Sequence, residues 1–242
     1  MFRYAVWLGC FLLILPSESI LAQSSPPLLT NDPGTPGPGK WEINVLTSLE
    51  RSNVNEEWEI PLFDFNYGVG DRCQLTTSIP FVVSREQGGE VGRAFDGVEI
   101  GVKYRFVDNP GTTGHNISLF PTVFFSFVDD KAMKLFLPFE WHLEWSKFGL
   151  TAELGHAWVN GKPDGWEGGV GAGVLLDPVA LLAEWHTQMR EAPFNLLGQV
   201  VDLGFTWEWS ETVSAFGSFG KSLENHDEAP TKWILAGVQF QF

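Results

Sequence analysis

The fold is decided by the stretch Trp233-Ile234-Leu235-Ala236-Gly237-Val238-Gln239-Phe240-Gln241-Phe242. In an extended chain successive side chains point to opposite faces, so the apolar residues from Ile234 to Phe242 share one face, while Gln239 and Gln241 share the other. This alternation predicts a β-strand with one apolar and one polar face. The apolar face continues to the end of the sequence, whereas a strand of a soluble domain is usually followed by a cap or a polar tail.

The same period of two recurs along the chain from about Lys40 onward. Between Val98 and Phe106, every second residue is apolar and the residues between them are charged or glycine. We expect about twelve such strands, an even number, as bacterial membrane barrels require. They cover approximately residues 40–50, 58–67, 72–83, 98–106, 116–127, 134–145, 148–159, 165–176, 179–190, 196–209, 212–221 and 233–242.

The links between these strands alternate in length, as they do in outer-membrane barrels with short periplasmic turns and longer outer loops. Short links fall at 68–71, 146–147, 177–178 and 210–211, and longer polar links at 51–57, 84–94, 160–164, 191–195 and 222–231. Two links depart from the rule. The link at 108–115 is loop-like where a turn is expected, so either one inner turn is extended or a strand boundary is misplaced. The link at 129–132 is brief for an outer loop.

The beginning of the sequence has the pattern of a secretory signal. Arg3 precedes an apolar run that is too short to span a membrane, and a small-residue exit follows near Ala22. We therefore expect a signal peptide at residues 1–22, an irregular Pro/Gly-rich periplasmic lead-in at 23–39 and a barrel at 40–242. The alternative for the lead-in is a plug that enters the barrel mouth.

Composition narrows the class further. The chain has 11 Trp and 20 Phe, and a formal net charge of -15. Such a negative charge excludes nucleic acid as a partner. After removal of the signal only Cys73 remains, which excludes an internal disulfide.

Alternation alone fits both a soluble β-sandwich and a membrane barrel, because each has one apolar and one polar face per strand. Aromatic residues near strand ends, such as Trp145, Trp207 and Trp209, favour the girdle of a membrane barrel. The fold class is therefore predicted as all-β, a transmembrane antiparallel up-and-down β-barrel of about 12 strands.

On this assignment the polar faces line the lumen. The candidates for lining and selectivity are Asp64, Arg72, Glu99, Lys103, Arg105, Glu140, His142, Glu144, Glu184, His186, Arg190 and Asp202. These charges either pair across the lumen and make it rigid, or they form a selective permeation path. Three glycines on one strand, Gly169, Gly171 and Gly173, leave space for a pathway or for the N-terminal segment.

The histidines are the candidates for catalytic chemistry. Glu140, His142 and Glu144 form a carboxylate, imidazole, carboxylate row, which a lumen polar cluster explains better than a metal site. The sequence has no phosphate loop, zinc spacing or nucleophile elbow. No catalytic residue, metal or cofactor is therefore expected.

Three strings give a more specific indication. They are Leu29-Thr30-Asn31-Asp32-Pro33-Gly34-Thr35-Pro36-Gly37-Pro38-Gly39-Lys40-Trp41-Glu42-Ile43-Asn44, Asp64-Phe65-Asn66-Tyr67-Gly68-Val69-Gly70-Asp71-Arg72-Cys73-Gln74-Leu75 and Gly101-Val102-Lys103-Tyr104-Arg105-Phe106. They resemble a family of bacterial outer-membrane barrels catalogued as putative MetA-pathway of phenol degradation proteins, or loosely as transporters. The final strand and Phe242 likewise resemble the closing strand that the barrel assembly machinery recognises. The resemblance implies a barrel and brings no catalytic residues.

We therefore expect a channel or transporter of the bacterial outer membrane for small solutes, with small hydrophobic or aromatic compounds as one option. The expected partners are outer-membrane lipid, the barrel assembly machinery through Phe242, and the solute. A structural or ligand-binding barrel with a filled lumen is the alternative, and a hydrolase on the barrel wall ranks third.

Overall fold

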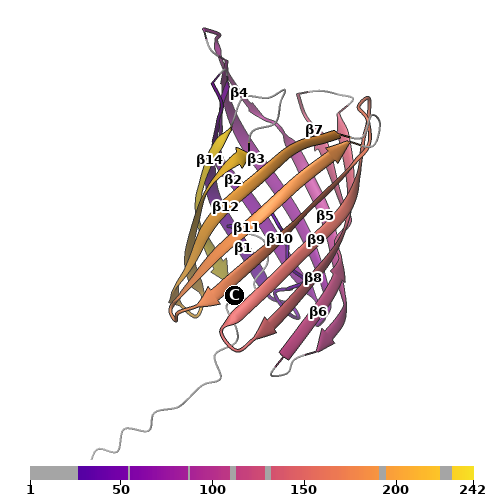
Figure 1. Cartoon of the computed structure of the whole chain (residues 1–242), viewed down its shortest axis with the longest axis vertical. Coiled ribbons are helices and arrows are strands. Elements are labelled where there is room, and N and C mark those ends of the chain that lie inside the picture. The colour runs from indigo at the N-terminus through magenta and orange to yellow at the C-terminus, as the bar shows by residue number, and fades with distance from the viewer. Residues whose placement is uncertain are drawn as a thin grey trace, which may run out of the picture.

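The computed structural model describes residues 27–53, 55–86, 88–109, 113–128, 132–190, 195–223 and 231–242. Within them the chain forms fourteen strand segments in one sheet (Figure 1). Their bounds are β1 Trp41–Arg51, β2 Asn55–Val69, β3 Cys73–Glu86, β4 Val91–Phe95, β5 Gly97–Asn109, β6 Thr113–Leu119, β7 Thr122–Ser126, β8 Met133–Trp145, β9 Phe148–Val159, β10 Gly165–Leu175, β11 Val179–Arg190, β12 Asn195–Ser210, β13 Val213–Leu223 and β14 Lys232–Gln241. Among the described residues, no helix is long and apolar enough to cross a membrane.

Two interruptions reduce these segments to 12 barrel strands. Only Asp96 separates β4 from β5, and both pair with β3. Phe120 and Pro121 separate β6 from β7, and both segments pair with β5 and β8. Proline has no N–H for the sheet, so the pairing breaks at Pro121 and resumes beyond it. The predicted number of strands is confirmed.

The barrel is closed by the first and last strands. β1 and β14 pair antiparallel from Glu42 opposite Gln241 to Arg51 opposite Lys232. The backbone of Trp41 exchanges two hydrogen bonds with that of Phe242, of 2.7 and 3.0 Å. The closing strand predicted at 233–242 therefore pairs with the first strand as expected, and the sheet has no free long edge at this seam.

The wall buries polar side chains and exposes apolar ones, which is the reverse of a soluble protein. Lys103, Gln74 and Glu140 are among the largest fully buried side chains, and they point into the lumen. On the outer surface, Leu203 and Trp209 are 66% and 67% exposed. A soluble sandwich buries its apolar faces, so this arrangement rules the sandwich out. A polar interior with an apolar exterior is what a barrel needs in a lipid bilayer.

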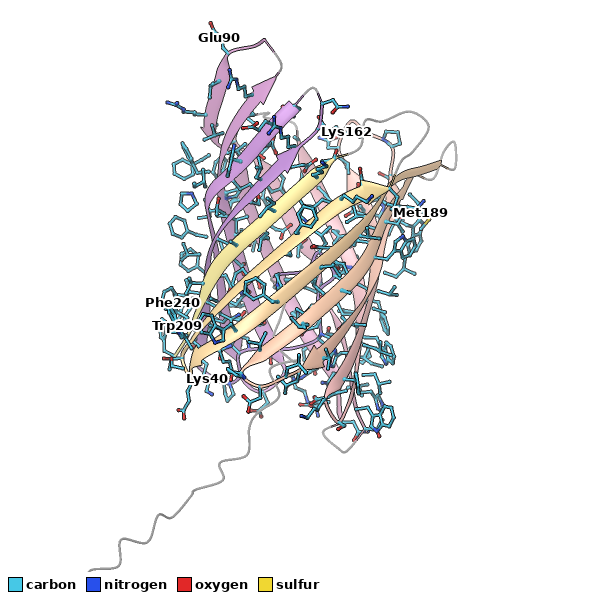
Figure 2. All side chains as sticks on the ribbon, turned by 60° about the vertical axis from the view of Figure 1, so that its left-hand side comes forward. Lys40, Glu90, Lys162, Met189, Trp209 and Phe240 are labelled. Carbon is cyan, nitrogen blue, oxygen red and sulfur yellow. The ribbon has the colours of Figure 1, made fainter. Side chains whose placement is uncertain are left out.

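The two ends of the barrel differ in their side chains and links. Trp209 and Phe240 lie near the end that carries Lys40, where the short turns are, and Glu90 and Lys162 lie at the opposite end (Figure 2). Aromatic rings cluster at the short-turn end, where the Trp207 and Trp209 rings are 5.5 Å apart. In a membrane barrel this end is the periplasmic one, and the end with longer links faces outward.

The loop predicted at 84–94 is wrong over most of its length. β3 continues to Glu86 and β4 begins at Val91, so the strands form a hairpin with Val83 opposite Arg93. Glu90 lies at the tip of this hairpin, beyond the rest of the rim (Figure 2). Because both faces of the hairpin meet water there, its sequence loses the apolar and polar alternation that reveals a wall strand.

At 108–115 the second alternative, a misplaced strand boundary, is the one observed. β5 runs to Asn109 and β6 begins at Thr113, with Asn109 opposite His115. Polar residues continue the strands past the apolar band at the periplasmic rim. The apparent exception to alternating link lengths was therefore an error in the strand boundary.

Candidate functional site

The main feature of the lumen is the N-terminal segment, whose described part is residues 27–39. The N–H groups of Leu29 and Thr30 donate to the two carboxylate oxygens of Glu184 on β11, at 2.6 and 2.9 Å. Glu184 is buried and points into the lumen. The described part of the lead-in that was expected in the periplasm therefore lies inside the barrel, as the plug alternative requires.

Two further strands hold the same segment. Asn31 donates its backbone N–H and its side-chain amide to one oxygen of Glu153 on β9, at 3.3 and 2.8 Å. The Lys103 ammonium on β5 donates to the backbone oxygen of Asp32. Contacts to β5, β9 and β11 place the segment across the lumen rather than along one strand.

Glycines make room for the segment. A Cβ on Gly169 would lie 2.2 Å from the Thr30 hydroxyl oxygen, and a Cβ on Gly204 would lie 2.9 Å from Pro27 Cγ. At Gly68 a Cβ would lie 1.7 Å from the backbone oxygen of Gly37. No side chain fits in these places without moving the segment. The sequence left two roles open for the glycines of this strand, a pathway or space for the N-terminal segment. At Gly169 the structure shows space for the segment.

Carboxylates form a belt around one side of the lumen beside the segment. Glu140 on β8 lies opposite Glu153 on β9, and Glu184 on β11 lies opposite Asp202 on β12. Between these pairs, β10 presents glycines, with Gly169 opposite Glu153 and Gly171 opposite Glu184. We call Glu140, Glu153, Glu184 and Asp202 the carboxylate belt.

One lysine reaches this region from β5, which is separated from β8 by β6. The Lys103 ammonium lies 3.3 Å from the Glu140 carboxylate, and both side chains are 0% exposed. The Ser118 hydroxyl donates to the same Glu140 oxygen, and the ammonium lies 4.7 Å from the centre of the Phe120 ring. Lys103 therefore neutralises Glu140 while it also holds the N-terminal segment at Asp32.

A cavity of about 170 Å³ remains between the segment and the wall. Asp64 and Glu99 border it, and Asp64 accepts hydrogen bonds from Asn44, Asn66 and Ser78 at 2.7 to 2.9 Å. At roughly 30 Å³ per water molecule, this space holds only a few waters. Leu28 and Asn31 of the N-terminal segment line this cavity together with wall residues.

The remaining predicted residues lie at several places on the wall and in its turns. His142 is buried and its Nδ1 lies 2.9 Å from the Thr151 hydroxyl, while Arg105 donates to the Asp71 backbone oxygen at 2.9 Å near the periplasmic rim. Arg72 is in an exposed turn and does not line the lumen as predicted, because the strand begins only at Cys73.

Glu144 and His186 keep their places on the inner face. Glu144 lies opposite Gly149 toward the periplasmic end, and His186 lies two residues beyond Glu184. Arg190 ends β11, and its side chain is outside the described part of the structure.

At the outward end, Lys134 and Glu167 form an ion pair of 2.7 Å beside a cavity of about 450 Å³. Within the described ranges, no group of three His, Cys, Asp or Glu side chains is arranged to hold a metal ion.

The sequence placed Glu140, Glu184 and Asp202 in the lumen, but it did not show that the N-terminal segment binds Glu153 and Glu184. The N–H groups of Leu29 and Thr30 carry no signal in a sequence, since every residue except proline has one. The glycines of β10 were the available clue, but they fitted either a pathway or space for the N-terminal segment.

Comparison with known proteins gives a consistent picture of the fold. No family model matches the chain, and no curated protein matches it. Among solved structures, the COG4313 outer membrane channel from Pseudomonas putida F1 has a TM-score of 0.65 at 10% identity, over 84% of this chain and 96% of that one.

Two porins are similar to nearly the same extent. The NanC porin has a TM-score of 0.60 at 6% identity, over 82% of this chain and 98% of that chain. The KdgM porin, solved in complex with disordered oligogalacturonate, has a TM-score of 0.59 at 8% identity, over 82% and 99%. At these identities the likeness concerns the fold, so this chain has the barrel fold of outer-membrane channels and porins.

Proposed function

We propose that this protein is a channel of the bacterial outer membrane for small polar solutes, and that residues 27–39 close it. The observation that carries the proposal is the way this segment lies across a closed barrel, held to the wall by side-chain hydrogen bonds. A net contribution of roughly 1.5–3 kcal/mol for each hydrogen bond to a charged group is enough to hold a segment that can still leave.

The proposed location follows from the surface. The apolar exterior requires lipid, and the fold is shared with outer-membrane channels and porins. Residues 1–22, which lie outside the described residues, would direct export, and Phe242 would be recognised by the barrel assembly machinery. Outer-membrane lipid then surrounds the wall.

Polar solutes are favoured over aromatic ones by the lumen itself. The described inner wall is rich in amides, hydroxyls and carboxylates, and its buried large apolar side chains are Leu46, Phe120 and Phe216. The phenol-degradation family that the sequence resembles would imply small hydrophobic or aromatic compounds. Such compounds would contact Leu46, Leu62 and Phe120 at the cavity beside the segment, but their apolar surface would offer no hydrogen bond to the carboxylates and amides around it.

A barrel with a permanently filled lumen is the second candidate, and the buried Lys103–Glu140 pair favours it because it ties the segment to the wall. A hydrolase is not supported. His142 bonds the Thr151 hydroxyl through Nδ1, but its Nε2 has no hydrogen-bond partner among the described residues. A catalytic triad needs an acid there to orient the ring.

The test uses a pair of substitutions at one position of the segment. Thr30→Pro removes the N–H that donates to Glu184 and leaves the wall unchanged, whereas Thr30→Val keeps that N–H. In planar bilayers, we expect full-length protein with Thr30→Pro to be open several times more often than wild type, and Thr30→Val to resemble wild type. If all three show no unitary current, the channel is wrong and the filled barrel replaces it.

A further inference from the structure

The carboxylate belt has four acidic side chains and, among the described residues, one ion pair with a lysine. Lys103 is paired with Glu140 at 3.3 Å. Among the described residues, no Lys or Arg makes an ion pair with Glu153, Glu184 or Asp202. His186 lies near Glu184 on the same face of β11, and the Trp233 indole N–H donates to Asp202 at 3.3 Å. Three carboxylates of the belt therefore lack a cationic partner there.

The N-terminal segment, which bonds to the belt, indicates which chemical groups the belt can bind. Glu184 and Glu153 together receive four N–H groups, from Leu29, Thr30 and twice from Asn31. All four donors are neutral, so they supply hydrogen bonds without balancing the charge. A ligand with N–H donors and a positive charge would supply both.

A second observation points to the same kind of ligand. Glu140 is 0% exposed, and its Oε1 accepts no hydrogen bond from the described residues, although its Oε2 accepts from Ser118. A buried carboxylate oxygen without a donor is costly unless something supplies one. Glu153 lies opposite Glu140, so a donor group between them would reach both carboxylates.

The shape of the belt favours an extended amine over a metal ion or an anion. Its carboxylates come from four strands, with the bare glycines of β10 in the middle. No three ligands of the described residues converge as a metal would require, and anions are repelled. An ammonium needs only one or two acceptors, and several along one molecule can follow a row of carboxylates.

We propose that the carboxylate belt is a binding site for small organic polycations with ammonium groups, and that the N-terminal segment occupies this site in the closed barrel. The segment and the cation compete for Glu153 and Glu184, so the bound cation favours the open lumen. This inference rests on the proposed channel function for its role in transport, but the binding site itself does not depend on conduction.

The test is equilibrium binding of spermidine to the purified full chain. Glu153→Gln/Glu184→Gln should weaken binding by about tenfold or more, since charge-assisted hydrogen bonds are lost. Thr30→Pro should strengthen binding severalfold, because it removes a competing N–H and leaves the belt intact. Glu208→Gln removes one carboxylate near the periplasmic end of β12, outside the belt, and should leave binding unchanged.

The outcomes separate this inference from the proposed channel. Equal spermidine binding by wild type and the double variant, or no binding by either wild type or Thr30→Pro, would overturn the site. Binding with the predicted order but without unitary current in bilayers would support the site and contradict the channel. If the double variant fails to fold, spermidine binding by Thr30→Pro and Thr30→Val is compared instead, because both keep every wall residue. Tighter binding by Thr30→Pro supports the site, and equal binding by the two overturns it.

Discussion

Lys103→Met is expected to destabilise the barrel strongly. In wild type the ammonium lies 3.3 Å from the Glu140 carboxylate, and neither side chain is exposed. Methionine fills a similar volume but leaves the carboxylate buried without its partner. Removing one member of a buried ion pair typically costs about 3–5 kcal/mol. That corresponds to roughly 150- to 4,000-fold in the folding equilibrium constant, at about 1.4 kcal/mol per factor of ten.

The assay is reversible urea unfolding in lipid vesicles, followed through the fluorescence of the 11 tryptophans. The matched control is Lys134→Met, because Lys134 forms a 2.7 Å ion pair with Glu167 whose side chains are 34% and 17% exposed. Partly solvated pairs contribute about 0–1 kcal/mol. Adding Glu140→Gln to Lys103→Met should recover much of the loss. If both lysine variants lose less than about 1 kcal/mol, water reaches Glu140 and the burial argument fails.

Three further predictions concern the segment, the closing strand and the outer face. Gly68→Ala should raise amide hydrogen exchange across residues 27–39, because its Cβ would lie 1.7 Å from the Gly37 oxygen. The control Gly198→Ala meets nothing within 4 Å and should not change the exchange. Equal exchange in the two variants would refute the packing of the segment against Gly68. Phe242→Ser should lower the amount of heat-modifiable folded barrel in outer-membrane fractions severalfold, and an unchanged amount would remove Phe242 from assembly. Cys73 should react with a membrane-impermeant maleimide much more slowly in vesicles than after unfolding, and equal rates would place it away from lipid.

The wall of the barrel could be predicted because its signal is local. Residues 98–106 alternate strictly, and the structure exposes Ile100 and Val102 outside and buries Lys103 inside. The signal fails where both faces meet the same solvent. The hairpin of β3 and β4 above the rim and the ends of β5 and β6 below it were predicted as loops, although their strands continue.

The lumen could be predicted only in part. The inward direction of Glu140, Glu184 and Asp202 follows from strand parity, because side chains alternate along every strand. Which carboxylate meets which partner depends on the register between strands and on the path of residues 27–39. That path has no periodicity, and its contacts to Glu184 use backbone N–H groups. Long-range pairing of this kind has no sequence pattern to reveal it.

The central claim, that residues 27–39 close a channel by a reversible contact, is tested most directly by locking that contact. A Cβ built on Gly169 lies 2.2 Å from Thr30 Oγ1, so in Thr30→Cys/Gly169→Cys, made in a Cys73→Ser background, the two thiols are adjacent and a small shift of the segment lets them form a disulfide. We expect the oxidised full-length protein to carry no unitary current in a planar bilayer, and current to appear in the same membrane after dithiothreitol is added. Equal current before and after reduction, with the disulfide verified by mass spectrometry, would contradict the claim.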